Sequence, residues 1–377
     1  MSVQEAAGQT AVPFLDLAPV HAPLKKALLD ELGELLDTGA FTNGPAVARF
    51  EEAFAAYCGV DHCVGVASGL DALRLGLLAT GLGPGDEVVV PAATFVATVE
   101  AVTQAGGVPV LADVSEDDYG LDPAAAAAAT GPRTHSLLPV HLYGQMADMR
   151  ALRTLAEEKG LALVEDACQA HGAERNRVRA GSTGTAAAFS FYPGKNLGAA
   201  GDAGAFVSND GDAAARVRAL REHGQTAKYV HALEGWTARL DTIQALVLSH
   251  KLPLLDGWNE QRRAAAAFYE EGLAGVGDLR LPPIAPESTP VWHLYVVRTA
   301  DPNALGLFLR ERSIGTGRHY PDPVHLTEAY TRLGHREGDF PVAEALSREC
   351  LSLPVFPGIS EAQLAAVVDG VRSFFDG

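Results

Sequence analysis

From about residue 64 the sequence alternates short apolar runs with segments of helix length, and this alternation constrains the fold more than any other feature. The runs are rich in Val, Leu and Phe and are apolar throughout, as expected for strands that are buried on both faces. We therefore predict an α/β fold with a mostly parallel seven-stranded sheet. The runs near 185–190 and 203–208 are close enough in the chain to form an antiparallel edge pair. The seven runs are HCVGVAS, DEVVVPA, VPVLADV, SLLPVHL, LALVEDA, AAAFSFY and GAFVSND.

A change of pattern near residue 255 predicts a second unit. A long helical pattern covers 240–273, and Pro253 is expected to bend it. We predict a large α/β domain over 1–254, with an N-terminal helical segment, and a small C-terminal α+β domain over 255–377. The elements expected in the small domain are a strand at 293–298 and helices near 302–313, 341–350 and 360–375.

Charge and composition exclude several classes of protein. The 377 residues include 29 basic and 47 acidic side chains, a net charge of −18, which argues against a nucleic acid or an anionic membrane as partner. The four cysteines form no C-x-x-C pair and no spacing suits a metal site, a pattern that fits a reducing cytosol. Neither a signal peptide at MSVQEAAGQT nor a membrane span is expected, so we expect a cytoplasmic protein.

Two segments beside predicted strand ends carry groups that could hold a ligand. Ser68 and Gly69 form a turn that opens a helix, whose free N–H groups suit a phosphate, although an ordinary N-cap is the alternative. Asp166 ends a strand at the edge where open α/β sheets bind ligands, unless it only caps the following segment. Gln169 lies just beyond it and could add a neutral hydrogen bond.

Lysine is scarce in this chain, and Lys195 stands out among the few present. It follows an apolar strand in the glycine-rich loop PGKNLGAAG, where the backbone can approach a ligand closely. A lysine in an apolar pocket can have the lowered pKa that a Schiff base requires, although a lysine whose stem merely packs on the surface is the alternative. Lys228, in a polar loop, stays open as a substrate contact.

Together these groups match the anchors of pyridoxal 5'-phosphate (PLP). Lys195 would form the imine, and Asp166 would keep the pyridine nitrogen protonated so that the ring accepts electrons. Ser190 could add a hydroxyl to the phosphate site. Phe95 follows another strand end and could stack on the ring, unless it belongs to the core.

The segments also resemble, in order and over nearly the whole chain, the DegT/DnrJ/EryC1/StrS family of PLP-dependent nucleotide-sugar aminotransferases. The resemblance implies the aspartate-aminotransferase-like fold (fold type I) and a homodimer with shared active sites. It also implies glutamate as amino donor and pyridoxamine phosphate as the intermediate form of the cofactor. The segments that carry it are PFLDL, SGLDAL, EVVVPAATFVAT, PVHLYGQ, EDACQAHGA, FSFYPGKNLGA with GDAGAF, the run from REHGQ to KYVH, RLD and HYPDPVH.

The resemblance implies roles for individual residues. Lys195 and Asp166 would be catalytic, and Gln169 would bond the phenolic oxygen of the cofactor. Two positions depart from the family pattern: Leu70 stands where threonine is usual, and Thr237 stands where asparagine reaches the neighbouring subunit's cofactor phosphate. The backbone N–H of Leu70 can still bind phosphate, whereas Thr237 offers one hydroxyl instead of an amide, so we expect somewhat weaker cofactor binding. The full set expected to bind the cofactor is Ser68, Gly69, Leu70, Phe95, Asp166, Gln169, Ser190, Lys195 and Thr237.

The activity implied is transfer of an amino group from glutamate to an NDP-keto-6-deoxyhexose, with dTDP favoured, at C3 or C4. The product would be a deoxyaminosugar nucleotide for antibiotic or glycan biosynthesis. Lys195 favours transamination, because the sugar 3-dehydratases of this group carry histidine there, and SGLDAL favours C3. Two alternatives remain: a cyclitol ketone as acceptor, or a non-catalytic PLP-binding regulatory protein. The residues expected to meet the sugar nucleotide are Lys228, Arg239, Arg318, His319 and Tyr320.

Overall fold

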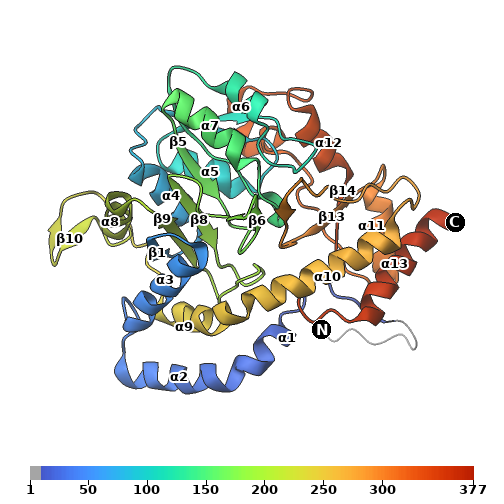
Figure 1. Ribbon diagram of the computed structural model, residues 1–377, viewed down its shortest axis with the longest axis horizontal. Helices are drawn as coiled ribbons and strands as arrows, with labels where there is room; N and C mark the ends of the chain where they lie inside the picture. The colour runs from blue at the N-terminus through green and yellow to red at the C-terminus, as the bar shows by residue number, and fades with distance from the viewer. Residues whose placement is uncertain (1–9) are drawn as a thin grey trace.

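The computed structural model describes residues 10–377, and a seven-stranded sheet lies at the centre of its larger part (Figure 1). The strand order is β1-β9-β8-β5-β4-β2-β3, and only the two pairs that involve β9 are antiparallel. The predicted α/β class and mostly parallel sheet are confirmed, and each of the seven apolar runs forms one strand. The strands are β1 (His62–Val66), β2 (Glu87–Pro91), β3 (Val108–Ala112), β4 (Thr134–Leu137), β5 (Ala162–Asp166), β8 (Ala186–Ser190) and β9 (Gly204–Ser208).

The expected antiparallel edge pair is half right. β8 and β9 do pair antiparallel, with Ala188 opposite Phe206. They do not form the edge, because β1 pairs with the outer side of β9 and places Val64 opposite Phe206 as well. A strand has hydrogen-bonding groups on both sides, and β1 satisfies the set that β8 leaves unpaired. The first strand in the chain therefore takes the edge position.

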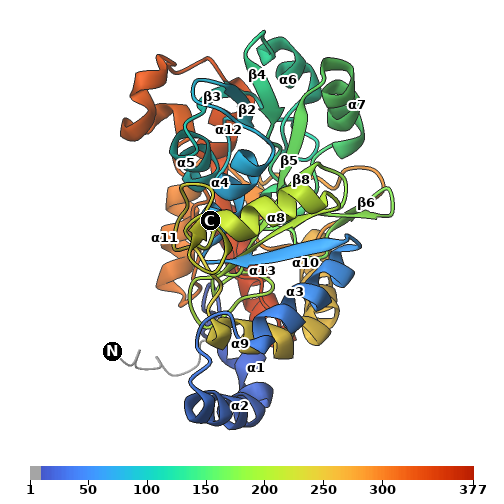
Figure 2. The ribbon, with the colours of Figure 1, turned by 90° about the vertical axis from the view of Figure 1, so that its left-hand side faces the viewer.

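Helices cover both faces of the sheet, which explains why the strands are apolar throughout. On β2, Val88 and Val90 pack into one core and Val89 packs into the other. Figure 2 shows α5 and α7 on opposite sides of the strands. The face that contains Val89 is covered by α3 (Pro45–Cys58), α6 (Pro123–Ala129), α7 (Met149–Lys159) and α9 (Thr242–Lys251). The other face is covered by α4 (Gly69–Ala79), α5 (Val96–Gln104) and α8 (Gly211–Leu220).

The C-terminal part of the chain contains helices and two short strands around a separate cluster of buried residues. Pro253, where the sequence predicts a bend in the long helix, lies in the short 3-10 turn Leu252–Leu254 between α9 and α10. The elements are α10 (Leu255–Leu273), β13 (Tyr295–Arg298), α11 (Pro302–Glu311), α12 (Pro341–Glu349), β14 (Cys350–Leu353) and α13 (Glu361–Asp376). Side chains of α12 pack into the core of the large sheet, so the division of the chain at residue 254 stays a prediction.

An exposed arm was not expected from the sequence. β10 (Gln225–Ala227) and β11 (Val230–His231) form a short hairpin that projects from the body on the left of Figure 1. Its tip carries Lys228 and Tyr229, and the Tyr229 side chain is 81% exposed. The remaining α-helices and strands of the described residues are α1 (Ala18–His21) and α2 (Lys25–Thr38) near the N-terminus, and a small sheet of β6 (Glu174–Arg175), β7 (Val178–Arg179) and β12 (Ser288–Thr289).

Over residues 10–377, none of the helices combines the length and the apolar character needed to cross a membrane.

Candidate active site

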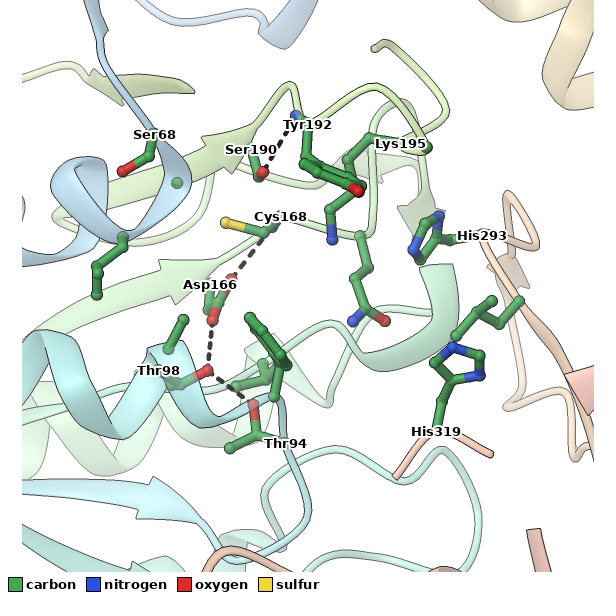
Figure 3. Close-up of a pocket in the computed structure, with 18 of the residues that line it drawn as sticks. Ser68, Thr94, Thr98, Asp166, Cys168, Ser190, Tyr192, Lys195, His293 and His319 are labelled. Atoms are coloured by element: carbon green, nitrogen blue, oxygen red, sulfur yellow. Dashed lines mark hydrogen bonds between the residues drawn. The ribbon is translucent and has the colours of Figure 1, made fainter. Parts of the chain in front are cut away.

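A cavity of about 640 Å³ collects most of the predicted site residues. Its wall is formed by the ends of β5 and β8, the first turns of α4 and α5, the loop after β8, and the segments 293–294 and 319–320 of the C-terminal part. Figure 3 shows the labelled side chains of these segments around one space. The predicted residues that line it are Ser68, Gly69, Leu70, Phe95, Asp166, Gln169, Ser190, Lys195, His319 and Tyr320.

The start of α4 forms one end of the cavity. The Ser68 hydroxyl caps the helix by accepting a hydrogen bond from the Asp71 N–H at 3.0 Å. A Cβ at Gly69 would lie 2.7 Å from the Ser190 Cβ and 2.8 Å from the Cys168 sulfur, so glycine lets three distant segments meet. The first N–H groups of a helix have no partner within it, and Ser68 and Ser190 both lie beside this helix start. This donor set is suited to a phosphate.

Asp166 lies at the carboxyl end of β5 and is oriented by two donors. Its Oδ2 accepts from the Thr98 hydroxyl at 2.7 Å, and its Oδ1 accepts from the Cys168 N–H at 3.2 Å. The Thr94 and Thr98 hydroxyls are also 2.7 Å apart. The sequence analysis did not identify either threonine, although both lie in the segment PAATFVAT that carries Phe95.

A closed loop between β8 and β9 holds Lys195. The Lys195 N–H donates to the Tyr192 carbonyl at 2.8 Å, and a Cβ at Gly198 would lie 2.3 Å from the Pro193 carbonyl oxygen, so the loop can close only over a glycine. The amine points into the cavity (Figure 3). Burial lowers the pKa of Lys195, and the neighbouring Cys168 and Asp166 partly offset this effect. The neutral amine is therefore easier to reach than in water.

Gln169 and two aromatic residues form the opposite wall. The Gln169 side-chain oxygen accepts from the Tyr143 N–H at 2.7 Å, and its amide nitrogen donates to the Tyr320 hydroxyl at 3.2 Å. These contacts fix which way the amide faces. Phe95 is 49% exposed, and the Tyr320 ring lies 5.4 Å from its centroid. Phe95 is thus a wall of the cavity and not a core residue.

His293, which the sequence analysis missed, contributes a neutral imidazole. The Asn196 amide nitrogen donates to Asn259 and to the Val291 carbonyl, so its oxygen faces the His293 Nδ1 at 3.3 Å. The proton of His293 is therefore assigned to Nδ1, which leaves Nε2 as an acceptor. Burial and the nearby Lys195 hold the pKa of His293 well below its usual value. They also lower the pKa of His319 to about 4, so both rings are neutral at pH 7.

Four predicted residues lie elsewhere in this chain. The Arg239 guanidinium pairs with Glu222 at 2.9 Å, and the Thr237 hydroxyl bonds the His223 ring at 3.0 Å. Lys228 lies on the exposed arm. Arg318 donates to the Asn303 side chain and to the Ser347 carbonyl, away from the cavity. Among the described residues that line the cavity, Lys195 is the only lysine or arginine, whereas Glu100, Asp166 and Asp202 are acidic.

The residues present fit PLP. The serine hydroxyls and the α4 amides suit its phosphate, the oriented Asp166 carboxylate suits its pyridine nitrogen, and the Lys195 amine suits its aldehyde. Gly69 keeps the phosphate end open to backbone approach. A metal site is not among the alternatives that the described part of the chain offers, since it contains no cluster of His, Cys, Asp or Glu suited to an ion.

Comparison with known proteins agrees with this chemistry. Residues 23–372 match the model of the DegT/DnrJ/EryC1/StrS aminotransferase family. The chain is 48% identical to dTDP-3-amino-3,4,6-trideoxy-alpha-D-glucose transaminase of Streptomyces venezuelae over 96% of both chains. It is also 48% identical to the erythromycin biosynthesis sensory transduction protein EryC1 of Saccharopolyspora erythraea, over 96% of this chain and 99% of the relative.

Two solved structures are similar to this chain in fold. The S. venezuelae DesV structure, in complex with a ketimine intermediate, has a TM-score of 0.95 and 48% identity, with 97% of this chain and 99% of that chain covered. The Bacillus subtilis NtdA structure, with bound cofactor PMP, has a TM-score of 0.91 and 29% identity, with 99% and 87% covered. The fold type I prediction is confirmed.

Proposed function

The chain belongs to the DegT/DnrJ/EryC1/StrS aminotransferase family, and from this premise we propose that it aminates C3 of a dTDP-linked keto-6-deoxyhexose. It is a PLP-dependent sugar aminotransferase, and glutamate is the proposed amino donor. The observation that carries the substrate proposal is the 48% identity, over 96% of both chains, to a transaminase named for a dTDP-3-amino sugar. The product would be a deoxyaminosugar nucleotide for antibiotic or glycan biosynthesis, as the erythromycin-pathway name of a second relative supports.

PLP supplies an electron sink that stabilises negative charge at the carbon next to the transferred nitrogen. Lys195 would hold the cofactor through its amine and, once free, its amine would accept the proton from that carbon as base and give it back as acid. Its lowered pKa favours the neutral amine needed for the first of these steps. The Asp166 carboxylate would keep the pyridine nitrogen protonated, Gln169 and Phe95 would orient the ring, and the two serines would hold the phosphate.

The regulatory alternative is not favoured by the site. One relative carries a sensory-transduction name, and a protein of that kind would need to bind PLP but not to turn over substrate. Here Lys195, Asp166 and Gln169 are all present and face one cavity. A binding protein needs no amine of lowered pKa beside an oriented carboxylate.

We also propose a homodimer in which each subunit completes the site of the other. A sugar nucleotide is dianionic, but the lining residues of one described chain include a single cation, Lys195, which the cofactor engages. Further cations must come from outside the cavity. The exposed arm offers Lys228, and Thr237 and Arg239 lie close to its base in the chain. We propose that this segment reaches the partner's cavity. The four free cysteines support the cytoplasmic location that we propose with it.

The C3 proposal is tested by identifying the sugar carbon that receives the nitrogen. We expect the PLP-loaded enzyme, supplied with glutamate, to convert a dTDP-3-keto-6-deoxyhexose into a product with nitrogen at C3, identified by NMR. The matched 4-keto isomer serves as the control substrate. Amination of the 4-keto isomer alone would contradict the C3 proposal, and amination of neither sugar would return the cyclitol ketone as the acceptor to test.

A further inference from the structure

A chain of three hydrogen-bonding side chains runs from the start of α5 to the carboxylate at the cavity floor. The Thr94 and Thr98 hydroxyls are 2.7 Å apart, and Thr98 Oγ1 lies 2.7 Å from Asp166 Oδ2. All three side chains are almost inaccessible to solvent, at 4%, 1% and 5% exposure respectively. Figure 3 shows the three groups in line, with Asp166 also bonded to the Cys168 backbone.

The direction of these hydrogen bonds follows from proton counting. An ionised carboxylate only accepts, so the single hydroxyl proton of Thr98 is directed to Asp166. Thr98 then has no proton left for Thr94, and Thr94 must donate to Thr98. The chain is therefore polarised toward the carboxylate, which strengthens each bond in it.

The geometry of Thr98 is not the default for a threonine near the start of a helix. Threonine in a helix commonly bonds a carbonyl of the preceding turn, and Thr103 on the same helix does so by donating to the Glu100 carbonyl at 3.0 Å. Thr98 instead donates across to β5, which is 68 residues away in sequence. One helix start thus presents both Phe95 to the cavity and the Thr98 hydroxyl to Asp166.

The Thr98 bond bears on the charge of Asp166. A buried carboxylate is costly unless donors surround it, and here the Cys168 N–H and the Thr98 hydroxyl each serve one oxygen. A hydrogen bond to a charged group stabilises it more than a hydrogen bond between two neutral groups does. Without the hydroxyl, Oδ2 of this buried carboxylate would lose its donor.

We propose that Thr98, supported by Thr94, is a positioning residue that keeps Asp166 ionised and oriented, so that the proton shared with the cofactor's pyridine nitrogen stays on the ring. The inference rests on the proposed function, because it assumes that PLP occupies the cavity. It predicts that the electron-accepting strength of the ring depends on a hydroxyl that does not touch it.

The test uses the full-length protein loaded with PLP. The pH dependence of the visible band of the lysine-bound cofactor reports on the ring charge, since a less positive ring lets the nitrogen at Lys195 keep its proton to higher pH. We expect Thr98→Val to raise the midpoint of this titration by about one pH unit, the size that losing one charged hydrogen bond allows. In the ¹⁵N NMR spectrum of ring-labelled PLP, the signal should move toward the unprotonated position.

Matched variants separate this role from simple packing. Thr98→Ser keeps the hydroxyl and should give the wild-type titration midpoint. Thr103→Val replaces another threonine of the same helix by valine and should leave the midpoint unchanged. Thr94→Val keeps the bond from Thr98 to Asp166 and should give a smaller upward shift, which also tests the chain if Thr98→Val fails to fold.

Either of two results would overturn the inference: a wild-type midpoint and ¹⁵N signal in Thr98→Val, or, if that variant does not fold, a wild-type midpoint in Thr94→Val. A wild-type protein that gains no visible band with PLP would instead contradict the proposed function. The two failures are therefore distinguishable.

Discussion

The two ends of the cavity are built differently. At the cofactor end, Asp166 has two donors, Lys195 lies in a closed loop, and Gly69 brings three segments into contact. At the other end, His293 and His319 are neutral, and the cations expected there are bonded elsewhere or exposed on the arm. Among the described residues, the cavity of one chain therefore offers the groups expected to hold the cofactor, whereas Lys195 is the only lysine or arginine that could meet a dianionic substrate. This difference is what the homodimer that we propose would explain, with catalysis within a subunit and much of the substrate recognition supplied by its partner.

The largest expected effect is at the cofactor end. Lys195→Ala should lower turnover by at least about 10³-fold, because no other amine in the cavity can move the proton. Cofactor retention after dialysis should persist, since the phosphate and Asp166 contacts remain. Lys159→Ala, an exposed lysine at the end of α7, is the matched control and should be fully active. A Lys195→Ala enzyme with wild-type turnover would show that the cavity is not the active site.

Mixed dimers test whether the second end is shared. Lys228→Glu on the arm should raise KM for the sugar nucleotide about tenfold while leaving the reaction with glutamate unchanged, because the arm charge is proposed to meet only the diphosphate of the sugar nucleotide. Mixing this chain with Lys195→Ala chains should restore normal KM at about a quarter of the sites, the statistical share in which an intact lysine meets an intact arm.

The mixing experiment gives a different result if the arm contacts the cavity of its own subunit. If the arm served its own subunit, each active Lys195 would remain beside an altered arm, and mixing would restore nothing. Activity no greater than the sum of the two separate variants would therefore place the arm in cis.

A smaller effect is expected at His319, whose pKa of about 4 keeps it neutral above pH 5. Between pH 5.5 and 7.5 the ratio of KM values for wild type and His319→Gln should stay constant, within about threefold of unity. A wild-type KM that falls relative to His319→Gln as the pH drops would show an imidazolium bound to the substrate phosphates.

The same histidine makes a prediction about stability. The unfolded chain takes up this proton near pH 6.5 and the folded chain only near 4, so protons favour the unfolded state in that window. Wild type should therefore lose thermal stability relative to His319→Gln as the pH falls from 6.5 to 4. Equal melting temperatures of the two proteins across this range would contradict the assigned burial of the ring.

The smallest effect concerns Thr237, which stands where relatives are expected to use asparagine. Thr237→Asn should lower the Kd for PLP about threefold, because an amide adds a donor to the partner's phosphate site. Thr226→Asn on the arm is the control and should leave the Kd unchanged. Weaker cofactor binding in Thr237→Asn would show that Thr237 serves its contact with His223 and not the cofactor.

Most residues expected at the cofactor end line one cavity because they follow strand ends. Asp166 and Ser190 end two parallel neighbours, β5 and β8, so the sheet itself brings them together. Thr98 and His293 were missed, because their roles depend on contacts with residues 68 and 97 positions away. No local pattern encodes such contacts.

The contacts of the Arg239 and Arg318 side chains could not be predicted for a different reason. Whether a guanidinium faces a cavity depends on its nearest acceptor, and Glu222 holds Arg239 while a backbone carbonyl holds Arg318. The exposed arm could not be predicted because its strands are only two or three residues long, which is too short to show a hydrophobic periodicity. The seven sheet strands, by contrast, follow directly from their apolar runs.

The most direct test of the central claim is the visible spectrum of the PLP-loaded protein. We predict a band from the lysine-bound cofactor that glutamate bleaches and that a dTDP-3-keto-6-deoxyhexose restores, with the sugar amine formed in equal amount. A band that glutamate leaves unchanged, or that the keto sugar fails to restore, would contradict the account.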